Sequence, residues 1–286
     1  MLRALPWLLA ALLLAACKPQ PAAETPPAAL PGAASEPAAA VRALAARLHN
    51  DDLAGFARAA VPPAEYARLE TTWRDGDSRW PLTLLPLDEQ LLPLLQTLSA
   101  EGAETRLKRD FDRQLAHQDR DLRDAARNLG LFGVRYVQEN DGYGDAERKH
   151  YAAVIQALSA WGQRAPLGDP ARAHAAIDRL CAAARRTGIA DDATLGRLGM
   201  EQSLQRLAPF FAELKAVLAD GYGLSLGDAL AQLQSGLLEQ HGDHARVQVR
   251  YPLAGTQIEA TTNLERRDGR WYLSSQLRQA ETASAQ

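Results

Sequence analysis

The sequence predicts an α+β protein that is predominantly helical: a multi-helix bundle followed by a C-terminal three-strand antiparallel meander. Apolar residues recur at intervals of three and four from residue 37 to about 241, as they do along one face of a helix. At residue 245 the period changes to two, as in a half-buried strand, and Asp268-Gly269 is typical of a hairpin turn. We therefore expect residues 37–286 to form a mainly helical domain that ends in a small antiparallel sheet at about 245–276.

The helices are placed by their apolar period and by the residues that begin and end them. The first is expected to begin at Pro37, just after Ser35, because proline suits the first turn of a helix. The second is short, is capped by Asn50 or Asp51, and ends before Pro62. Further helices are expected at about 64–74, 88–99, 103–138, 146–162, 170–186, 192–219 and 225–241.

Three of these helices carry further signals. The narrow apolar stripe of 103–138 favours antiparallel pairing with another helix. Pro209 should kink or split the helix that contains it, and Gly221 fits a C-terminal cap. Ser225 with Asp228 resembles a capping box and should open the last helix.

The meander should bury one face against the helices. Its first strand alternates Val247, Val249 and Tyr251 with polar residues. Trp271 and Tyr272 are adjacent in the last strand, so they point to opposite faces. We assign Trp271 to the core, because a large indole gains most from burial, and Tyr272 to the outer face.

The N-terminus has the layout of a secretory signal. Residues 4–14 are apolar except for Pro6, and as a helix they would rise roughly 16 Å, about half of a bilayer core. The segment ends in Leu14-Ala15-Ala16-Cys17, which resembles the lipobox of bacterial lipoproteins. The resemblance implies cleavage after residue 16 and lipidation of Cys17. An ordinary signal peptide with a chance cysteine is the alternative.

The resemblance also implies a location in the cell. Lys18 stands where an aspartate would favour the inner membrane, which implies the periplasmic side of the outer membrane. Residues 17–36 are mostly proline and alanine and are expected to form an extended tether, reaching about 50 Å at about 3 Å per residue.

Composition limits the partners. The formal net charge of −3 argues against nucleic acid as a partner. The chain has two cysteines, so lipidation of Cys17 would leave Cys181 without an intrachain partner. The membrane, through the lipid, and an envelope protein are the partners we expect.

Two distant stretches suggest a further likeness. "LHNDDLAGF", at residues 48–56, and "RRDGRWYL", at 266–273, together resemble the ends of a ketosteroid-isomerase-like cone domain. The resemblance implies a first helix packed on a curved sheet. About 180 mostly helical residues separate the two stretches, and no catalytic residue can be carried over.

One constellation of reactive side chains stands out. His174, Asp178 and Cys181 are spaced by four and three residues, which places them on one face of one helix. An imidazole, a carboxylate and a thiol suggest a nucleophile or a zinc site. Close helix packing is the alternative, because alanines flank the set. Asp243 with His241 and His244 could chelate a metal or simply lie in a solvated loop.

These observations predict a lipid-anchored, non-enzymatic envelope protein that acts as a binding or scaffold module. We expect no catalytic residues, no bound metal and no cofactor, because no P-loop, nucleophile elbow or His-Glu-x-x-His motif occurs. The alternative is a small-ligand carrier or enzyme with a pocket between sheet and helices. An apolar cavity of several hundred Å³ would favour the carrier, and a filled core with an exposed apolar patch would favour the scaffold.

Overall fold

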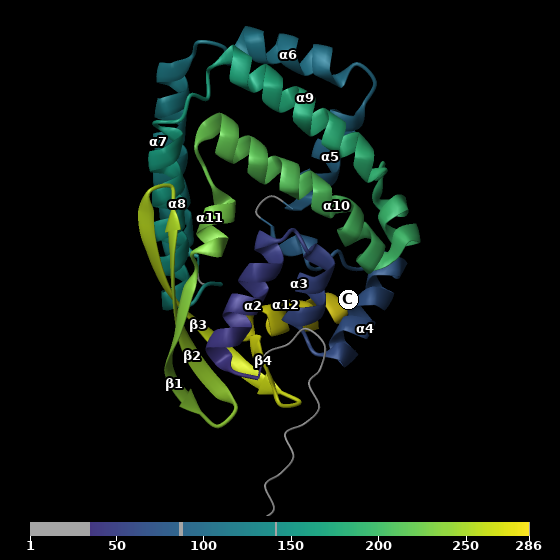
Figure 1. Cartoon of the computed structure of the whole chain (residues 1–286), viewed down its shortest axis with the longest axis vertical. Helices are drawn as coiled ribbons and strands as arrows, with labels where there is room; N and C mark the ends of the chain where they lie inside the picture. Colours follow the sequence, from purple (N-terminus) through teal and green to yellow (C-terminus); the bar gives the residue numbers. More distant parts are fainter. Residues whose placement is uncertain (1–34, 86–87, 141, 286) are drawn as a thin grey trace, which may run out of the picture.

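The computed structural model describes residues 35–85, 88–140 and 142–285. It is predominantly helical and carries its sheet near the C-terminus, so the predicted fold class is confirmed (Figure 1). The sheet has four strands rather than three. The predicted signal peptide, Cys17 and most of the tether lie outside the described residues.

Three short helices open the described chain. They are α2 (Pro37–His49), α3 (Leu53–Ala60) and α4 (Pro63–Asp75). A proline occupies the first turn of α2, as predicted, and Pro63 opens α4, which was expected to begin at residue 64. The residue that caps α3 is Asp52, whose carboxylate accepts a hydrogen bond from the Gly55 N–H at 2.8 Å.

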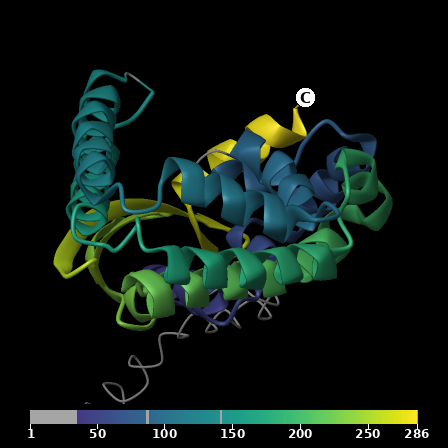
Figure 2. The same cartoon turned by 90° about the horizontal axis from the view of Figure 1, so that it is seen from above.

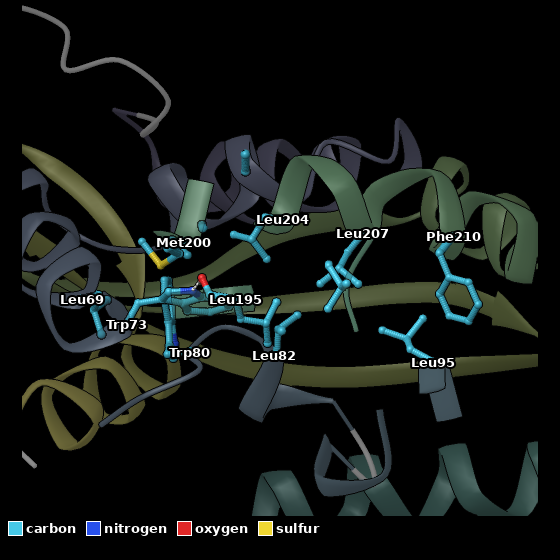
Figure 3. Close-up of a cluster of buried hydrophobic side chains, with 14 of the residues drawn as sticks. Leu69, Trp73, Trp80, Leu82, Leu95, Leu195, Met200, Leu204, Leu207 and Phe210 are labelled. Atoms are coloured by element: carbon cyan, nitrogen blue, oxygen red, sulfur yellow. Dashed lines mark hydrogen bonds between the residues drawn. The ribbon is translucent and has the colours of Figure 1, made fainter. Parts of the chain in front are cut away.

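A second group of helices packs against α3 and α4 through its member α10. It consists of α5 (Leu91–Ser99), α6 (Ala103–Gln114), α9 (Pro170–Thr187) and α10 (Asp192–Tyr222), preceded by the short 3₁₀ turns η1 (Leu82–Leu84) and η2 (Asp88–Gln90). Their shared core contains Trp73, Trp80, Leu204 and Phe210 (Figure 3). The indole N–H of Trp73 donates to the carbonyl of Leu195 at 3.0 Å, so this large side chain is buried without losing its hydrogen bond.

The helix predicted at 103–138 is two helices, α6 and α7 (Asp119–Glu139). The chain turns between them at His117, which has a positive φ of 61°. The N–H of His117 donates to the carbonyl of Gly168 at 2.9 Å, and this tertiary bond fixes the turn. The apolar period continues across the break, so it could not reveal the turn.

Helix α7 pairs closely with α8 (Asp145–Gly162), but not through the leucine stripe from which pairing was predicted, since Leu129 of that stripe is 69% exposed. Gly130 and Gly133 bring the two backbones together, and a Cβ on Gly130 would lie 2.3 Å from the Ser159 hydroxyl. That hydroxyl donates to the carbonyl of Ala126 at 3.0 Å. The hairpin of α7 and α8 lies at one edge of the molecule (Figures 1 and 2).

The kink in α10 lies at Gly199, which has φ 74° and ψ 170°, and not at Pro209. Proline lacks an N–H but can continue a helix when the neighbouring turns adjust. The positive φ at residue 199 requires glycine more strictly. The helix ends at Gly223 in the left-handed conformation, two residues beyond the predicted cap at Gly221.

The segment predicted as a helix at 225–241 divides into a helix and a strand. Ser225 caps α11 (Leu226–Ala231), its hydroxyl accepting from the Asp228 N–H at 3.1 Å as the capping motif predicted. Residues Gln234–His241 then form β1. Cross-strand pairing with β2 overrides the local helical preference of this leucine- and glutamate-containing stretch.

The sheet is an antiparallel meander in the order β1-β2-β3-β4. Its other strands are β2 (His244–Leu253), β3 (Thr256–Arg267) and β4 (Arg270–Leu273). Asp268 and Gly269 have positive φ values of 51° and 73° and form the predicted hairpin turn. The chain continues past the sheet into α12 (Ser274–Ser284), which the sequence analysis did not predict.

Both faces of the sheet are covered near β4. Helices α2, α8 and α11 pack on the face that carries Val247, Val249 and Trp271. Helices α3 and α12 pack against this end of the sheet as well. Trp271 is therefore 2% exposed and Tyr272 only 1%, so the assignment of Tyr272 to an outer, solvated face was wrong.

Candidate functional site

A cavity of about 550 Å³ lies between the sheet, α8 and α11. Its position is that of the pocket foreseen in the carrier alternative. Most of its lining side chains are apolar: Val41, Val154, Leu158, Leu226, Ala229, Leu230, Leu233, Val249, Leu253, Ala260 and Leu273. A volume of several hundred Å³ is typical of a site for a small molecule.

The lining follows directly from the periods of the elements. On α8, His150, Val154 and Leu158 recur every four residues and so share one face. On β2, Val249 and Tyr251 recur every two residues and face them. Both helix and strand thus present their apolar faces to the same space.

Several of these apolar side chains are only half-buried. Val154, Leu158, Leu230 and Leu233 belong to this group, although each lies on the inward face of its helix or loop. Apolar surface that borders a cavity gains free energy when a ligand removes it from water, at about 25 cal/mol per Å². The lining is therefore suited to an apolar ligand.

One polar pair points into this apolar space. The imidazole Nε2 of His150 and the hydroxyl of Tyr251 are 2.7 Å apart. Burial raises the pKa of Tyr251 to about 12 and lowers the pKa of His150, so both side chains are neutral at pH 7. The ring of Tyr151 stacks on His150, with centroids 5.5 Å apart. The pair can offer a ligand hydrogen bonds without a charge.

The carboxylate at the edge of the lining already has partners. Glu147 accepts from the N–H of Gly144 at 3.0 Å, at the start of α8, and lies 3.6 Å from the guanidinium of Arg278. Its negative charge is therefore balanced on the protein. The remaining polar groups of the lining are hydroxyls such as those of Thr262 and Ser275.

A larger cavity of about 770 Å³ lies between the segment around 76–92 and α12. Its lining is rich in charged side chains, including Asp77 and Glu89, which are solvent-exposed. Of the two arginines in this lining, Arg79 is engaged by the carboxylate of Asp192 at 2.6 and 2.7 Å, and Arg278 lies near Glu147. The smaller cavity has the apolar lining and the neutral polar pair that a ligand site needs.

The structure does not assemble His174, Asp178 and Cys181 into a reactive group. His174 bonds to the carboxylate of Asp112 at 2.8 Å, and Asp178 pairs with Lys108 at 2.6 Å, so both link α9 to α6. Cys181 is fully buried in the core, and burial raises the pKa of its thiol. These contacts match the packing alternative.

The structure does not arrange the other candidate metal ligands, His241, Asp243 and His244, around a common point. His241 and His244 are exposed at the β1–β2 turn, where Asp243 pairs with Arg266 at 2.7 Å. Within residues 35–85, 88–140 and 142–285, no three His, Cys, Asp or Glu side chains are grouped as a metal site would require. Cys17 lies outside the described residues.

Sequence reasoning missed His150 and placed Tyr251 only as an apolar-face residue of a strand. The available signal was the four-residue spacing of His150, Val154 and Leu158, an imidazole on the apolar face of a helix. Nothing in the sequence brought that face opposite Tyr251, since 100 residues separate them.

Comparisons with known proteins return no match: no protein-family model, no curated protein and no solved structure resembles this chain. The lipoprotein and cone-domain resemblances therefore stay predictions. Among the described helices, none is long and apolar enough to cross a bilayer.

Proposed function

We propose that this chain is a lipid-anchored, non-enzymatic binding module of the cell envelope, tethered through Cys17 to the periplasmic side of the outer membrane. Its ligand is a small, mostly apolar and uncharged molecule held between the sheet, α8 and α11. The observation that carries the proposal is the 550 Å³ cavity with its largely apolar lining. By the criterion set from the sequence, such a cavity favours a carrier over a pure scaffold.

The neutral pair of His150 and Tyr251 narrows the ligand class. A charged ligand would lose its hydration on entering this lining and would meet no opposite charge in return. A molecule with one hydroxyl, carbonyl or amide group can replace or extend the 2.7 Å bond of the pair.

Titration of the full-length chain with the neutral apolar fluorophore N-phenylnaphthylamine tests the ligand site. Saturable binding is expected, and Ala260→Phe should abolish it because the added ring fills the cavity. Tyr251→Phe should weaken it several-fold, about 1 kcal/mol for one lost hydrogen bond. Tyr222→Phe, outside the cavity lining, is the matched control. Binding that survives Ala260→Phe would place the probe elsewhere and contradict the proposal.

The anchor is tested separately. Cells that express the protein are grown with labelled palmitate, and the label is expected on the wild type and absent from Cys17→Ser. The variant should also leave the membrane fraction, because each buried CH₂ of the lipid contributes about 0.8 kcal/mol to membrane binding. Label retained on the serine variant would refute lipidation at Cys17.

A further inference from the structure

Helix α7 carries a strip of mostly exposed apolar side chains beside the side that packs on α8. The members, which we call the outer strip, recur every three and four residues: Leu122, Ala125, Leu129, Phe132 and Tyr136. Leu129 and Phe132 are each 69% exposed and Tyr136 is 54% exposed. The rings of Phe132 and Tyr136 stack with centroids 6.4 Å apart. This three-four spacing is the seam pattern of paired helices.

Apart from the half-buried Leu122, the strip has no cover within the described chain. The neighbouring side of α7, about a quarter turn around the helix, carries Gly130, Gly133 and the buried Val137 and packs on α8. The α7–α8 hairpin lies at an edge of the molecule (Figure 2), and Leu129, Phe132 and Tyr136 of the strip are exposed. The segment 129–137 has Arg135 as its one charged residue, a composition that favours burial on all sides.

The polar residues beside the strip are arranged for self-pairing. Asp121, Asn128 and Arg135 are spaced by seven residues and so run along one border of the strip. When two such helices pair antiparallel about a two-fold axis near Asn128, Asp121 of each copy meets Arg135 of the other. Asp121 forms no ion pair within the described residues, and Arg135 has only an exposed i,i+4 pair with Glu139.

We propose that the outer strip binds a second copy of this chain, α7 against α7, antiparallel and two-fold symmetric. In this arrangement Phe132 packs beside the second copy's Leu122, and Leu129 beside its Ala125, so large residues meet smaller ones. Each ion pair of Asp121 with Arg135 forms twice by symmetry, as in any isologous interface. The two α7–α8 hairpins would then form a four-helix bundle.

Charge favours this occupant over a lipid surface. A helix that lies on an anionic membrane carries mainly basic residues beside its apolar face. On α7 the four arginines are offset by three aspartates and one glutamate, so the helix has no net charge. Alternating signs beside an apolar seam are instead the pattern that selects a helical partner and its direction.

Cross-linking of the full-length chain tests the pairing. Asn128→Cys places one thiol on each side of the axis, and a short bis-maleimide should join two chains into a species of twice the 31.0 kDa mass. Leu131→Cys is the matched control, because Leu131 is 67% exposed but lies off the strip. The wild type reports any linkage through Cys17 or Cys181.

Charge reversal distinguishes this pairing from random contact. Adding Asp121→Arg or Arg135→Asp to Asn128→Cys should reduce the dimer to the level of the Leu131→Cys control. Combining both reversals should restore it, because the two ion pairs re-form with exchanged signs. Phe132→Glu should abolish it. Equal cross-linking of Asn128→Cys and Leu131→Cys, or no rescue by the double reversal, would overturn the proposal.

If every variant and the wild type stay monomeric, the proposed pairing of α7 with α7 is also overturned. A lipid surface or residues 18–34 of the chain would then be the remaining candidates to bind the strip. The result is independent of the ligand site, since Ala260→Phe should leave the dimer unchanged.

Discussion

The imidazole Nε2 of His150 lies 2.7 Å from the hydroxyl of Tyr251 and joins α8 to β2 across the cavity. The two rings meet edge to face, with centroids 6.0 Å apart. This contact sets the polarity of the proposed ligand site and also contributes to the packing of the α7–α8 hairpin on the sheet.

The first prediction concerns pH. Burial lowers the pKa of His150 below its ordinary value of 6.5, so the unfolded chain binds the proton more readily than the folded one. The contribution of neutral His150 to the free energy of unfolding should therefore be complete above about pH 6.5. It should be lost as the pH drops through the pKa of His150 in the folded protein. Urea melts of wild type and His150→Gln at several pH values measure this. The variant should lose part of the acid dependence, whereas His241→Gln, at an exposed turn, should keep it. Identical pH profiles for wild type and His150→Gln would contradict the assignment.

A second prediction concerns the two aromatic residues of β4. Trp271→Ala and Tyr272→Ala should each cost about 3 to 5 kcal/mol, because both side chains are buried, on opposite faces. Tyr272→Phe should be neutral or stabilising, since the Tyr272 hydroxyl is buried without a hydrogen-bond partner among the described residues. Denaturant melts give all three values. A loss for Tyr272→Phe comparable to that of Tyr272→Ala would mean that the hydroxyl has a partner.

The helices, and the change from helical to strand period near residue 245, were predictable because the spacing of apolar residues can be read within each short segment of the sequence. The helix at 170–186 is one case, since Asp169, Pro170 and Gly188 mark both ends of α9. The break at His117 and the strand β1 were not predictable. The first depends on the carbonyl of Gly168, some 50 residues away, and the second on pairing with β2. In both cases a tertiary contact decides between local alternatives of similar free energy.

The candidate site was even harder to predict from the sequence than these elements of the fold. Its existence between sheet and helices was an alternative that the sequence left open, but its residues were not named. The residues that were named, His174, Asp178 and Cys181, do share a helix face, and the structure gives each a separate environment. Spacing predicts which side chains share a face, and it does not predict what the face meets.

A third prediction tests the packing role of Cys181. Cys181→Ala should cost about 1 to 2 kcal/mol from a small cavity and leave binding of N-phenylnaphthylamine unchanged. The thiol should also resist maleimide in the folded protein, because it is buried and its pKa is raised. Rapid labelling under native conditions, or loss of binding without loss of stability, would restore the reactive-site hypothesis.

The last prediction concerns the close approach of α7 and α8. Replacing glycine by alanine inside a helix normally stabilises it by about 0.5 to 1 kcal/mol. At Gly130 the sign should reverse, because the new methyl would lie 2.3 Å from the Ser159 hydroxyl and force the two helices apart. Gly221→Ala in α10 is the matched control: it meets nothing within 4 Å and should stabilise the protein. Adding Ser159→Gly to Gly130→Ala should recover part of the loss, since it removes both side-chain atoms that the methyl meets, the hydroxyl at 2.3 Å and the Cβ at 2.4 Å. Thermal melts of the three variants and the wild type decide the matter, and a stabilised Gly130→Ala protein would show that the hairpin can open without cost.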